Sequence, residues 1–276
     1  MARRPASAFL TPWGPLLTGT VLLGLTACGT PVPVDPPLVC GNAKRPEVSS
    51  PDVRKSDVSS LDVSNLKVRG LSQCGPTADF TPVNSYQGEF ADVLDREDAV
   101  ALLDGRCTGT LIEASAGPVV ITAGHCVGLG DRSLLVFNFE DNPDGEQLVT
   151  EGTVIEQSLE PDYALIRLDV LPAVMPVLLT TQASERLAII QHARGKPKAI
   201  AEGRYLDACD RQVYYVDLDT LVGSSGAGIL TRQGYLLGIH TDGDCDEKGG
   251  GANRGWTAEA IVEASEYLQS TDIAER

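Results

Sequence analysis

The stretch Val119-Val120-Ile121-Thr122-Ala123-Gly124-His125-Cys126 joins a run of β-branched residues to one of only 3 histidines in the 276-residue chain. Similar short apolar runs, broken by Gly, Pro and Asp, recur from about residue 85 onward, with a composition and spacing typical of a β-sandwich or barrel. The sequence therefore predicts an all-β domain. We expect strands at residues 109–113, 119–123, 134–139, 148–157, 163–168, 213–218, 227–231 and 235–240.

One segment near the C-terminus has helical spacing instead. Thr257 can cap a helix there, Glu259 falls in the first turn, and Ile261, Ala264 and Leu268 lie on one face. We expect a terminal helix at about residues 257–271.

Three polar residues lie beside predicted strands in the order histidine, aspartate, serine. His125 follows one strand, Asp162 opens the segment DYALIRL (162–168), and Ser225 lies in GSSGAG (223–228). A serine hydroxyl becomes nucleophilic when a neutral imidazole accepts its proton and a carboxylate fixes the tautomer of that imidazole. Glycines around Ser225 permit a tight turn that exposes the hydroxyl and backbone N–H groups. Each residue alone is more often structural, but together they predict nucleophilic catalysis.

The chain order excludes two other kinds of serine hydrolase. An α/β-hydrolase places its serine first, in a G-x-S-x-G turn that Ala227 would break here. Subtilisin-type enzymes place the aspartate first. A metallohydrolase has no support either, because the chain contains no H-E-x-x-H segment and no closely spaced histidine pair.

The segments TAGHC (122–126), DYALIRL and GSSGAG together resemble the motifs of chymotrypsin-like serine peptidases, most closely the bacterial glutamyl-endopeptidase branch. The similarity covers about residues 85–276. It implies that His125 is the general base, that Asp162 orients it and that Ser225 attacks a peptide carbonyl. The N–H groups of Gly223 and Ser225 would then form the oxyanion hole.

The resemblance also implies a fold of two antiparallel six-stranded β-barrels with the active site between them. The first barrel would span about residues 85–175 and the second about residues 176–256, followed by the C-terminal helix. Many enzymes of this kind carry an aspartate directly before the nucleophile, where it pairs with a freshly cut N-terminal amine. Ser224 occupies that position here, which puts this activation route in doubt.

Six cysteines remain once Cys28 is set aside, and an even number in an exported chain suggests disulfides. In the family that the chain resembles, the cysteine of CTGTLI (107–112) pairs with the cysteine beside the histidine, which implies a Cys107–Cys126 bond. Closing this loop of about 20 residues would contribute about 3 kcal/mol on chain-entropy reasoning. The other pairings stay open: Cys40 with Cys74 and Cys209 with Cys245 are candidates, and unrelated pairings are equally allowed.

Two features give opposite indications of substrate specificity. Asp219 lies six positions before Ser225, where trypsin-like enzymes keep the pocket carboxylate, and this resemblance implies that it binds a basic side chain before the scissile bond through a charge-assisted pair. His240 and Thr220 match residues that contact an acidic side chain in glutamyl endopeptidases, and an imidazole suits such an anion. We expect an acidic preference because His240 is the more distinctive of these features.

The first 84 residues read as a leader and a tether rather than as part of the fold. Arg3, Arg4 and the apolar stretch that follows are typical of a signal peptide. The segment LTAC (25–28) resembles the bacterial lipobox, which implies a lipoprotein signal peptide at residues 1–27 with Cys28 lipidated. Residues 28–84 are predicted to form an extended tether. They begin with a Pro-rich stretch and continue with a run in which valine recurs at every fifth position. The chain is therefore expected to be exported and anchored to the bacterial membrane through Cys28.

The composition bounds the partners. A formal net charge of −16 repels phosphate backbones, so we expect protein or peptide substrates and no nucleic acid. No cofactor or metal site is indicated, and a monomer is expected. His192, in a basic stretch at residues 191–196, is expected in a solvated loop. The alternative function is a catalytically inactive surface-binding protein on the same scaffold.

Overall fold

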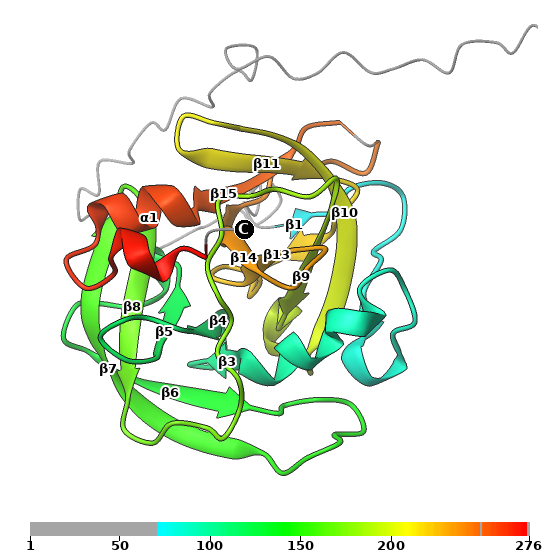
Figure 1. Cartoon of the computed structure of the whole chain (residues 1–276). Coiled ribbons are helices and arrows are strands. Elements are labelled where there is room, and N and C mark those ends of the chain that lie inside the picture. Colours follow the sequence, from blue (N-terminus) through cyan, green and yellow to red (C-terminus); the bar gives the residue numbers. More distant parts are fainter. Residues whose placement is uncertain (1–70, 249, 275–276) are drawn as a thin grey trace, which may run out of the picture. The chain divides into compact units, whose positions relative to one another are not determined.

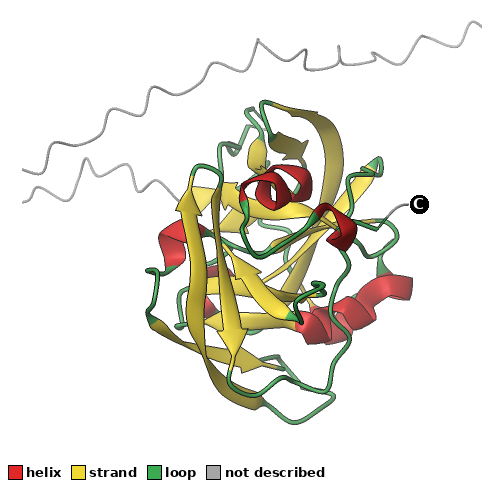
Figure 2. Cartoon of the chain, turned by 60° about the vertical axis from the view of Figure 1, so that its left-hand side comes forward, coloured by secondary structure: helices red, strands yellow, loops and turns green. Residues whose placement is uncertain are grey.

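The computed structural model describes residues 71–248 and 250–274. The predicted signal peptide (1–27), the predicted lipidation site Cys28 and most of the predicted tether (28–84) lie outside this part of the chain. The described elements are traced in Figure 1, and Figure 2 shows them to be mainly strands joined by loops, with a few short helices. Among the described residues, no helix has the length and apolar character needed to cross a membrane.

The first barrel is closed and contains six antiparallel strands in the order β3-β4-β5-β8-β7-β6. The strands β3, β4 and β5 are buried along their whole length, whereas β6 alternates exposed and buried residues, as expected for a strand with one face in solvent. The bounds are β3 (Val100–Leu103), β4 (Cys107–Ile112), β5 (Val119–Thr122), β6 (Arg132–Phe137), β7 (Leu148–Leu159) and β8 (Asp162–Leu168).

The second barrel comes from a seven-stranded sheet in the order β11-β15-β14-β13-β9-β10-β2. An additional pairing between β10 and β11 closes six of these strands into a ring and leaves β2 attached to β10. The prediction of two antiparallel six-stranded barrels is therefore confirmed. The bounds are β2 (Thr81–Pro82), β9 (Arg186–Gln191), β10 (Ala199–Cys209), β11 (Gln212–Val216), β13 (Gly228–Thr231), β14 (Leu236–Asp242) and β15 (Asn253–Thr257).

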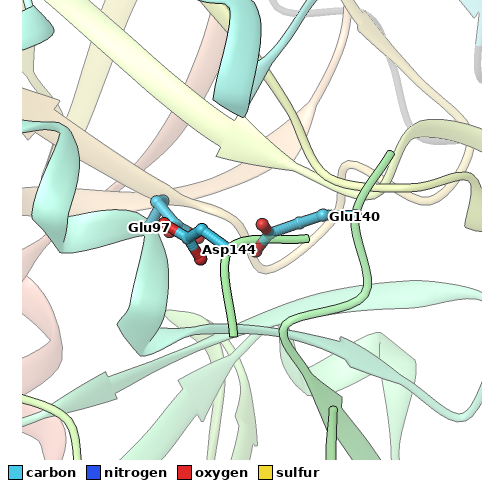
Figure 3. A group of neighbouring side chains, drawn as sticks. All are labelled: Glu97, Glu140 and Asp144. Carbon is cyan, nitrogen blue, oxygen red and sulfur yellow. The ribbon is translucent and has the colours of Figure 1, made fainter. Parts of the chain in front are cut away.

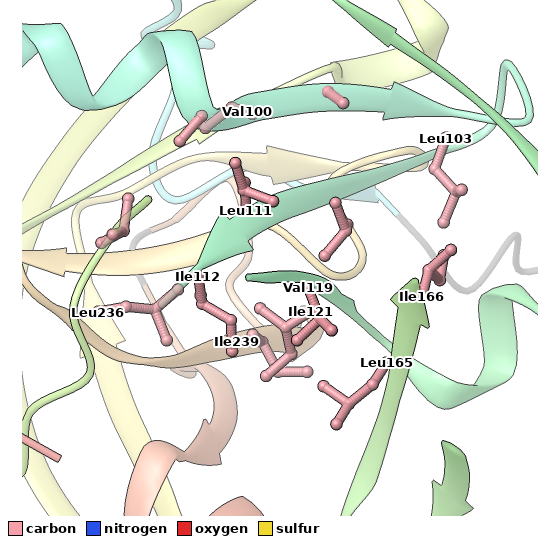
Figure 4. Packing of buried hydrophobic residues seen from close by; sticks show 14 of the residues in the cluster. Val100, Leu103, Leu111, Ile112, Val119, Ile121, Leu165, Ile166, Leu236 and Ile239 are labelled. Atoms are coloured by element: carbon pink, nitrogen blue, oxygen red, sulfur yellow. The ribbon is translucent and has the colours of Figure 1, made fainter. Parts of the chain in front are cut away.

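The two barrels share one hydrophobic cluster. Leu111, Ile112 and Ile121 of the first barrel belong to the same buried cluster as Leu236 and Ile239 of β14, and Figure 4 shows these side chains gathered between the strands. Burying a large aliphatic side chain contributes about 1.5–3 kcal/mol. This shared core fixes the position of one barrel relative to the other. A site that takes residues from both barrels depends on that fixed position.

A buried ion-pair network also joins the barrels. The ammonium of Lys198 contacts the carboxylate of Glu97 and lies 2.6 Å from Glu140 Oε1, and all three side chains are almost fully buried. Together with Asp144, these two glutamates form the one group in the described part whose ligand atoms lie close enough to hold a metal ion (Figure 3). Lys198 already supplies a positive charge there. Burial raises the pKa of Glu97 to about 8, whereas Glu140, although buried too, has its pKa held below the ordinary value by a hydrogen bond from Lys198.

The C-terminal helix is shorter than predicted. Helix α1 spans Ala258–Ala264, and Thr257 caps it by accepting a hydrogen bond from Ala260 N–H at 3.2 Å, as expected. It stops at Ser265, whose hydroxyl accepts hydrogen bonds from the N–H groups of Tyr267 and Leu268 and so competes with the helical pattern. Leu268 is still buried, but from the segment after the helix. The short 3-10 helices are η2 (Val83–Ser85), η3 (Ala91–Ala99), η4 (Gly124–Cys126), η5 (Ala193–Gly195) and η6 (Ser270–Asp272).

The segment before the first barrel is built into the second barrel. Strand β1 (Leu71–Ser72) pairs with β12 (Thr220–Leu221), directly before the predicted nucleophile loop. Cys74 forms a disulfide with Cys245, which rules out both the Cys40–Cys74 and the Cys209–Cys245 pairings. The reason is spatial, since β1 and β2 run along the second barrel and bring Cys74 to the loop that follows β14. Residues 71–84 of the predicted tether thus contact the barrel.

Candidate active site

The strand register of the first barrel brings His125 and Asp162 together. Strands β5 and β8 are antiparallel with Thr122 opposite Ala164. Residue 124 therefore falls opposite Asp162, and the turn at η4 places His125 directly over it. Gly124 makes this possible, because a Cβ at this position would lie 2.0 Å from the carbonyl oxygen of Ser158.

Both carboxylate oxygens of Asp162 engage His125. Oδ1 accepts a hydrogen bond from the His125 backbone N–H at 2.9 Å, and Oδ2 lies 2.6 Å from Nδ1. This bond raises the pKa of His125 above its usual 6.5, against the opposing effect of burial. The histidine side chain remains 43% exposed, so its second nitrogen can meet solvent or a substrate. Asp169, the other carboxylate near this strand, pairs instead with Arg132 at the surface.

The loop around Ser225 is a pair of tight turns that need glycine. Gly223 and Gly226 both have positive φ angles, of 98° and 83°. A Cβ on Gly226 would lie 2.1 Å from the hydroxyl oxygen of Thr122 and 2.4 Å from the carbonyl oxygen of Thr108. The loop therefore lies directly against the first barrel, and Ser225 is only partly buried in it.

The peptide planes of this loop are fixed by hydrogen bonds to their carbonyls. Val222 O accepts from Arg194 N–H at 2.5 Å, and Ser224 O accepts from Ala227 N–H at 3.0 Å. Since a trans peptide is planar, each bond also fixes the direction of the following N–H, on Gly223 and on Ser225. Neither of these N–H groups donates to an acceptor within residues 71–248 and 250–274. Two oriented backbone donors of this kind can bind an oxyanion.

A disulfide holds the serine loop close to the histidine. Cys107 and Cys126 are bonded, with their Cα atoms 6.3 Å apart, so the predicted pairing is confirmed. Cys126 directly follows His125, and its Sγ lies 3.9 Å from the carbonyl oxygen of Ser225. The structure thus brings His125, Asp162 and Ser225 into one place from three separate segments.

Asp219, the predicted ligand of a basic side chain, has its carboxylate occupied by the main chain. It is 2% exposed. Oδ1 accepts from Cys74 N–H at 2.6 Å and Oδ2 accepts from Asp79 N–H at 2.5 Å. Burial raises the pKa of Asp219, and these two bonds act in the opposite direction. The carboxylate serves to fasten the segment that precedes the first barrel.

His240 and Thr220, the predicted contacts of an acidic side chain, are both buried. The main chain of His240 joins the serine loop, because its N–H donates to Ala227 O at 2.9 Å and its carbonyl accepts from Gly226 N–H at 2.8 Å. Its Nδ1 is hydrogen-bonded to the hydroxyl of Tyr215. Burial lowers the pKa of His240 to about 3, so the imidazole is neutral near pH 7.

The loop at residues 192–196 supports the site in a way that the sequence did not suggest. His192 is fully buried, not solvated as expected, because its ring packs on Phe139 and its Nδ1 bonds Lys196 O at 2.9 Å. Arg194 supports the site by donating its N–H to Val222 O. The backbone conformation that allows this, with a positive φ of 56°, leaves no mark in the sequence. Together with the segment 73–80 and residues 245–247, this loop lines a cavity of about 660 Å³. His125, Asp162 and Ser225 are not among the residues that line this cavity.

A comparison with protein families finds a match in the region of the chain that contains this site. Residues 107–239 match the family model of the trypsin-like peptidase domain. The match includes His125, Asp162 and Ser225 and stops one residue before His240. It supports a serine protease. Among curated proteins, none matches the chain.

The fold is similar to two crystal structures of Rv3671c, both of an inactive form. A serine-to-alanine mutant from M. tuberculosis aligns with a TM-score of 0.51 and 16% identity over 68% of this chain and 93% of its own. The Rv3671c protease aligns with a TM-score of 0.50 and 16% identity over 62% of this chain and 89% of its own. At this level of identity the likeness concerns the fold.

Proposed function

We propose that this chain is a serine endopeptidase in which Ser225 is the nucleophile, His125 the general base and Asp162 the residue that orients it. The observation that carries the proposal is the pair of hydrogen bonds from His125 to Asp162, made beside a serine loop whose two oriented N–H groups meet no acceptor among the described residues. The match to the trypsin-like peptidase domain supports it.

The reaction would proceed in two stages. The Ser225 hydroxyl adds to the peptide carbonyl while its proton moves to Nε2 of His125, and the oxyanion is bound by the N–H groups of Gly223 and Ser225. Collapse of this intermediate breaks the C–N bond, and His125 returns the proton to the leaving amine. Water then adds to the acyl-enzyme with His125 again as base, which releases the acid and restores Ser225. Asp162 keeps the Nδ1 proton in place throughout.

Fluorophosphonate labelling of purified residues 71–276 tests this proposal and separates it from an inactive binding protein. Wild type should be labelled and should hydrolyse a casein or peptide-library substrate. Ser225→Ala should lose both, a loss of several orders of magnitude, with unchanged circular dichroism. A folded wild type that neither reacts nor cleaves would favour the surface-binding alternative.

For the residue before the scissile bond, we propose an acidic preference through His240, with Thr220 as a second donor. The structure weakens the case for a basic preference, because both oxygens of Asp219 are already bonded to the main chain. With its Nδ1 accepting from Tyr215, a neutral His240 would donate from Nε2 to a carboxylate.

A peptide library scanned at this position decides between the two preferences. We expect cleavage after Glu, lost in His240→Ala, and a preference that stays constant from about pH 6 to pH 9, because the His240 pKa lies near 3. Cleavage after Lys or Arg that disappears in Asp219→Asn would overturn the acidic preference.

We also propose that the chain is exported as a lipoprotein anchored at Cys28, which rests on the sequence alone. Metabolic labelling with a fatty-acid analogue should tag the wild type and spare Cys28→Ser, which should be found in the soluble fraction. Three acyl chains exceed the two signals needed for stable anchoring. A soluble, unlabelled wild type would contradict this proposal and leave the enzymatic one untouched.

A further inference from the structure

Thr108, in the middle of the CTGTLI segment, contacts the serine loop at two points. Its backbone N–H donates to Ser225 O at 3.0 Å, and its hydroxyl donates to Gly223 O at 2.8 Å. Both acceptors belong to the residues whose own N–H groups would bind the oxyanion. One residue of the first barrel therefore holds the peptide that links the two donor peptides, Gly223–Ser224, and the peptide that follows them, Ser225–Gly226.

The hydroxyl of Thr108 is also fixed from its other side. His192 N–H donates to Thr108 Oγ1 at 3.0 Å, so the hydroxyl proton is left to point at Gly223 O. Thr108 has no exposed surface, and water cannot replace the hydroxyl without opening the barrel interface. Its carbonyl accepts from the Thr122 hydroxyl at 2.8 Å, which ties the same point to the strand that leads to His125.

These bonds complete a continuous set along the loop. The carbonyls of Val222 and Ser224 are held by Arg194 and Ala227, and those of Gly223 and Ser225 are held by Thr108. Four consecutive peptide planes are thus fixed, two of them by a single residue of the other barrel. Because donors must be placed within a few tenths of an ångström to stabilise an oxyanion, loosening one plane lowers the rate without removing a reacting group.

We propose that Thr108 is a positioning residue, whose side-chain hydroxyl sets the orientation of the Gly223–Ser224 peptide and thereby of the oxyanion hole. This proposal rests on the proposed peptidase function. It assigns Thr108 a role in the rate of the chemical step and none in substrate affinity.

Thr110 supplies a matched control. It lies two residues along the same strand, it is equally buried, and its hydroxyl accepts a hydrogen bond from Gly228 N–H at 3.3 Å. Gly228 is outside the pair of N–H donors. Thr108→Val and Thr110→Val each remove one buried hydroxyl and keep the shape of the side chain, so they should lower thermal stability to a similar extent.

The test measures kcat, KM and the melting temperature for Thr108→Val, Thr108→Ser and Thr110→Val on one peptide substrate. Thr108→Val should lower kcat by about 10- to 100-fold, less than the loss of a whole oxyanion donor, with KM nearly unchanged. Thr108→Ser should restore most of kcat, and Thr110→Val should keep it. Binding of a peptide aldehyde, which forms a tetrahedral adduct, should weaken in Thr108→Val by the same factor as kcat/KM.

Equal kcat losses in Thr108→Val and Thr110→Val, following the melting temperature, would show that Thr108 acts only on stability and would overturn the proposal. A loss confined to KM would overturn it as well. Failure of the peptidase function itself would appear differently, as an inactive wild type that is indistinguishable from Ser225→Ala.

Discussion

Each barrel carries an aspartate beside the candidate site whose two oxygens both accept hydrogen bonds, and the two are used in different ways. Asp162 of the first barrel gives both oxygens to His125. Asp219 of the second barrel gives both to the N–H groups of Cys74 and Asp79, in the segment that precedes the first barrel. The first fixes a group that can transfer a proton, and the second fixes a length of main chain.

The difference shows that the partner atoms of a carboxylate, more than its spacing from a nucleophile, determine its task. Asp219 has the spacing of a specificity residue but no free oxygen for a substrate. Asp162 opens strand β8, and both of the hydrogen bonds that its carboxylate accepts among the described residues come from His125. Four changes would break or sharpen this comparison.

The largest effect is expected for Asp162→Asn. The amide would hold His125 in the wrong tautomer, and kcat should fall by about 10,000-fold with little change in KM. Since the bond to Asp162 raises the pKa of His125, the acid limb of the residual pH–rate profile should move to lower pH. Asp169→Asn is the control and should retain wild-type kinetics, because Asp169 contacts only surface groups among the described residues. A comparable loss in Asp169→Asn would transfer the orienting role to that residue.

The Cys74–Cys245 disulfide should matter more for stability, and the Cys107–Cys126 disulfide should matter more for kcat. Replacing Cys74 and Cys245 with serine opens a loop of 171 residues and should lower the free energy of unfolding by about 5 kcal/mol on chain-entropy reasoning. Replacing Cys107 and Cys126 should cost about 3 kcal/mol but should lower kcat more, since Cys126 lies against Ser225 O. Urea titration and steady-state kinetics measure both. The reverse order in kcat would mean that the segment before the barrel matters more to the site.

Asp219→Asn should lower the free energy of unfolding by about 2 kcal/mol, because the amide nitrogen faces a backbone N–H and one charge-assisted bond is lost. The change should act on the segment at residues 74–79, so protease susceptibility there should rise while kcat changes less than twofold. Hydrogen exchange of the Asp79 amide reports the loss directly. A fall in kcat that matches Asp162→Asn would refute the division of tasks between the two aspartates.

The smallest effect is expected at Glu97, in the network that joins the barrels. Its folded pKa of about 8 lies above the ordinary 4.5, so its contribution to stability is present at low pH and is lost as pH rises toward 8. Wild-type unfolding free energy should therefore fall by about 1–2 kcal/mol between pH 7 and pH 9, and this fall should be reduced in Glu97→Gln. Chemical denaturation at several pH values measures it. An identical slope in both proteins would assign the pH dependence to other groups.

Much of the fold could be predicted from the sequence, because many strands of both barrels are short apolar runs. All eight expected strands are present, with shifts of one to a few residues at their ends. The strands that were not expected are β1, β2, β3, β9, β10, β12 and β15. β10 is interrupted by Gly203 and flanking charges, and the glycine is there because a Cβ would lie 2.3 Å from Val216 O on the neighbouring strand. The need for a glycine at position 203 arises only when the barrel closes, so the local sequence of β10 does not show the pattern of a strand.

The candidate site divides in the same way. The proximity of His125 to Asp162 follows from motifs that lie on neighbouring strands, and the Cys107–Cys126 bond followed from the resemblance. The support of the serine loop by Thr108 and Arg194 could not be derived, since Thr108 and Gly223 are 115 positions apart and meet only when the barrels pack. The occupied carboxylate of Asp219 was missed for the same reason, because its partners come from a segment that looked like tether.

The Cys74–Cys245 bond has a mechanical consequence for a chain held by its N-terminal end. Tension applied upstream of Cys74 passes through the sulfur bridge to residue 245 and continues toward the C-terminus. Residues 75–244 form a loop outside this load path, and the loop contains His125, Asp162 and Ser225. Pulling on the predicted tether would therefore act first on the hydrogen bonds between β1 and β12. The covalent path through the Cys74–Cys245 bridge would bypass His125, Asp162 and Ser225 until the bridge is reduced.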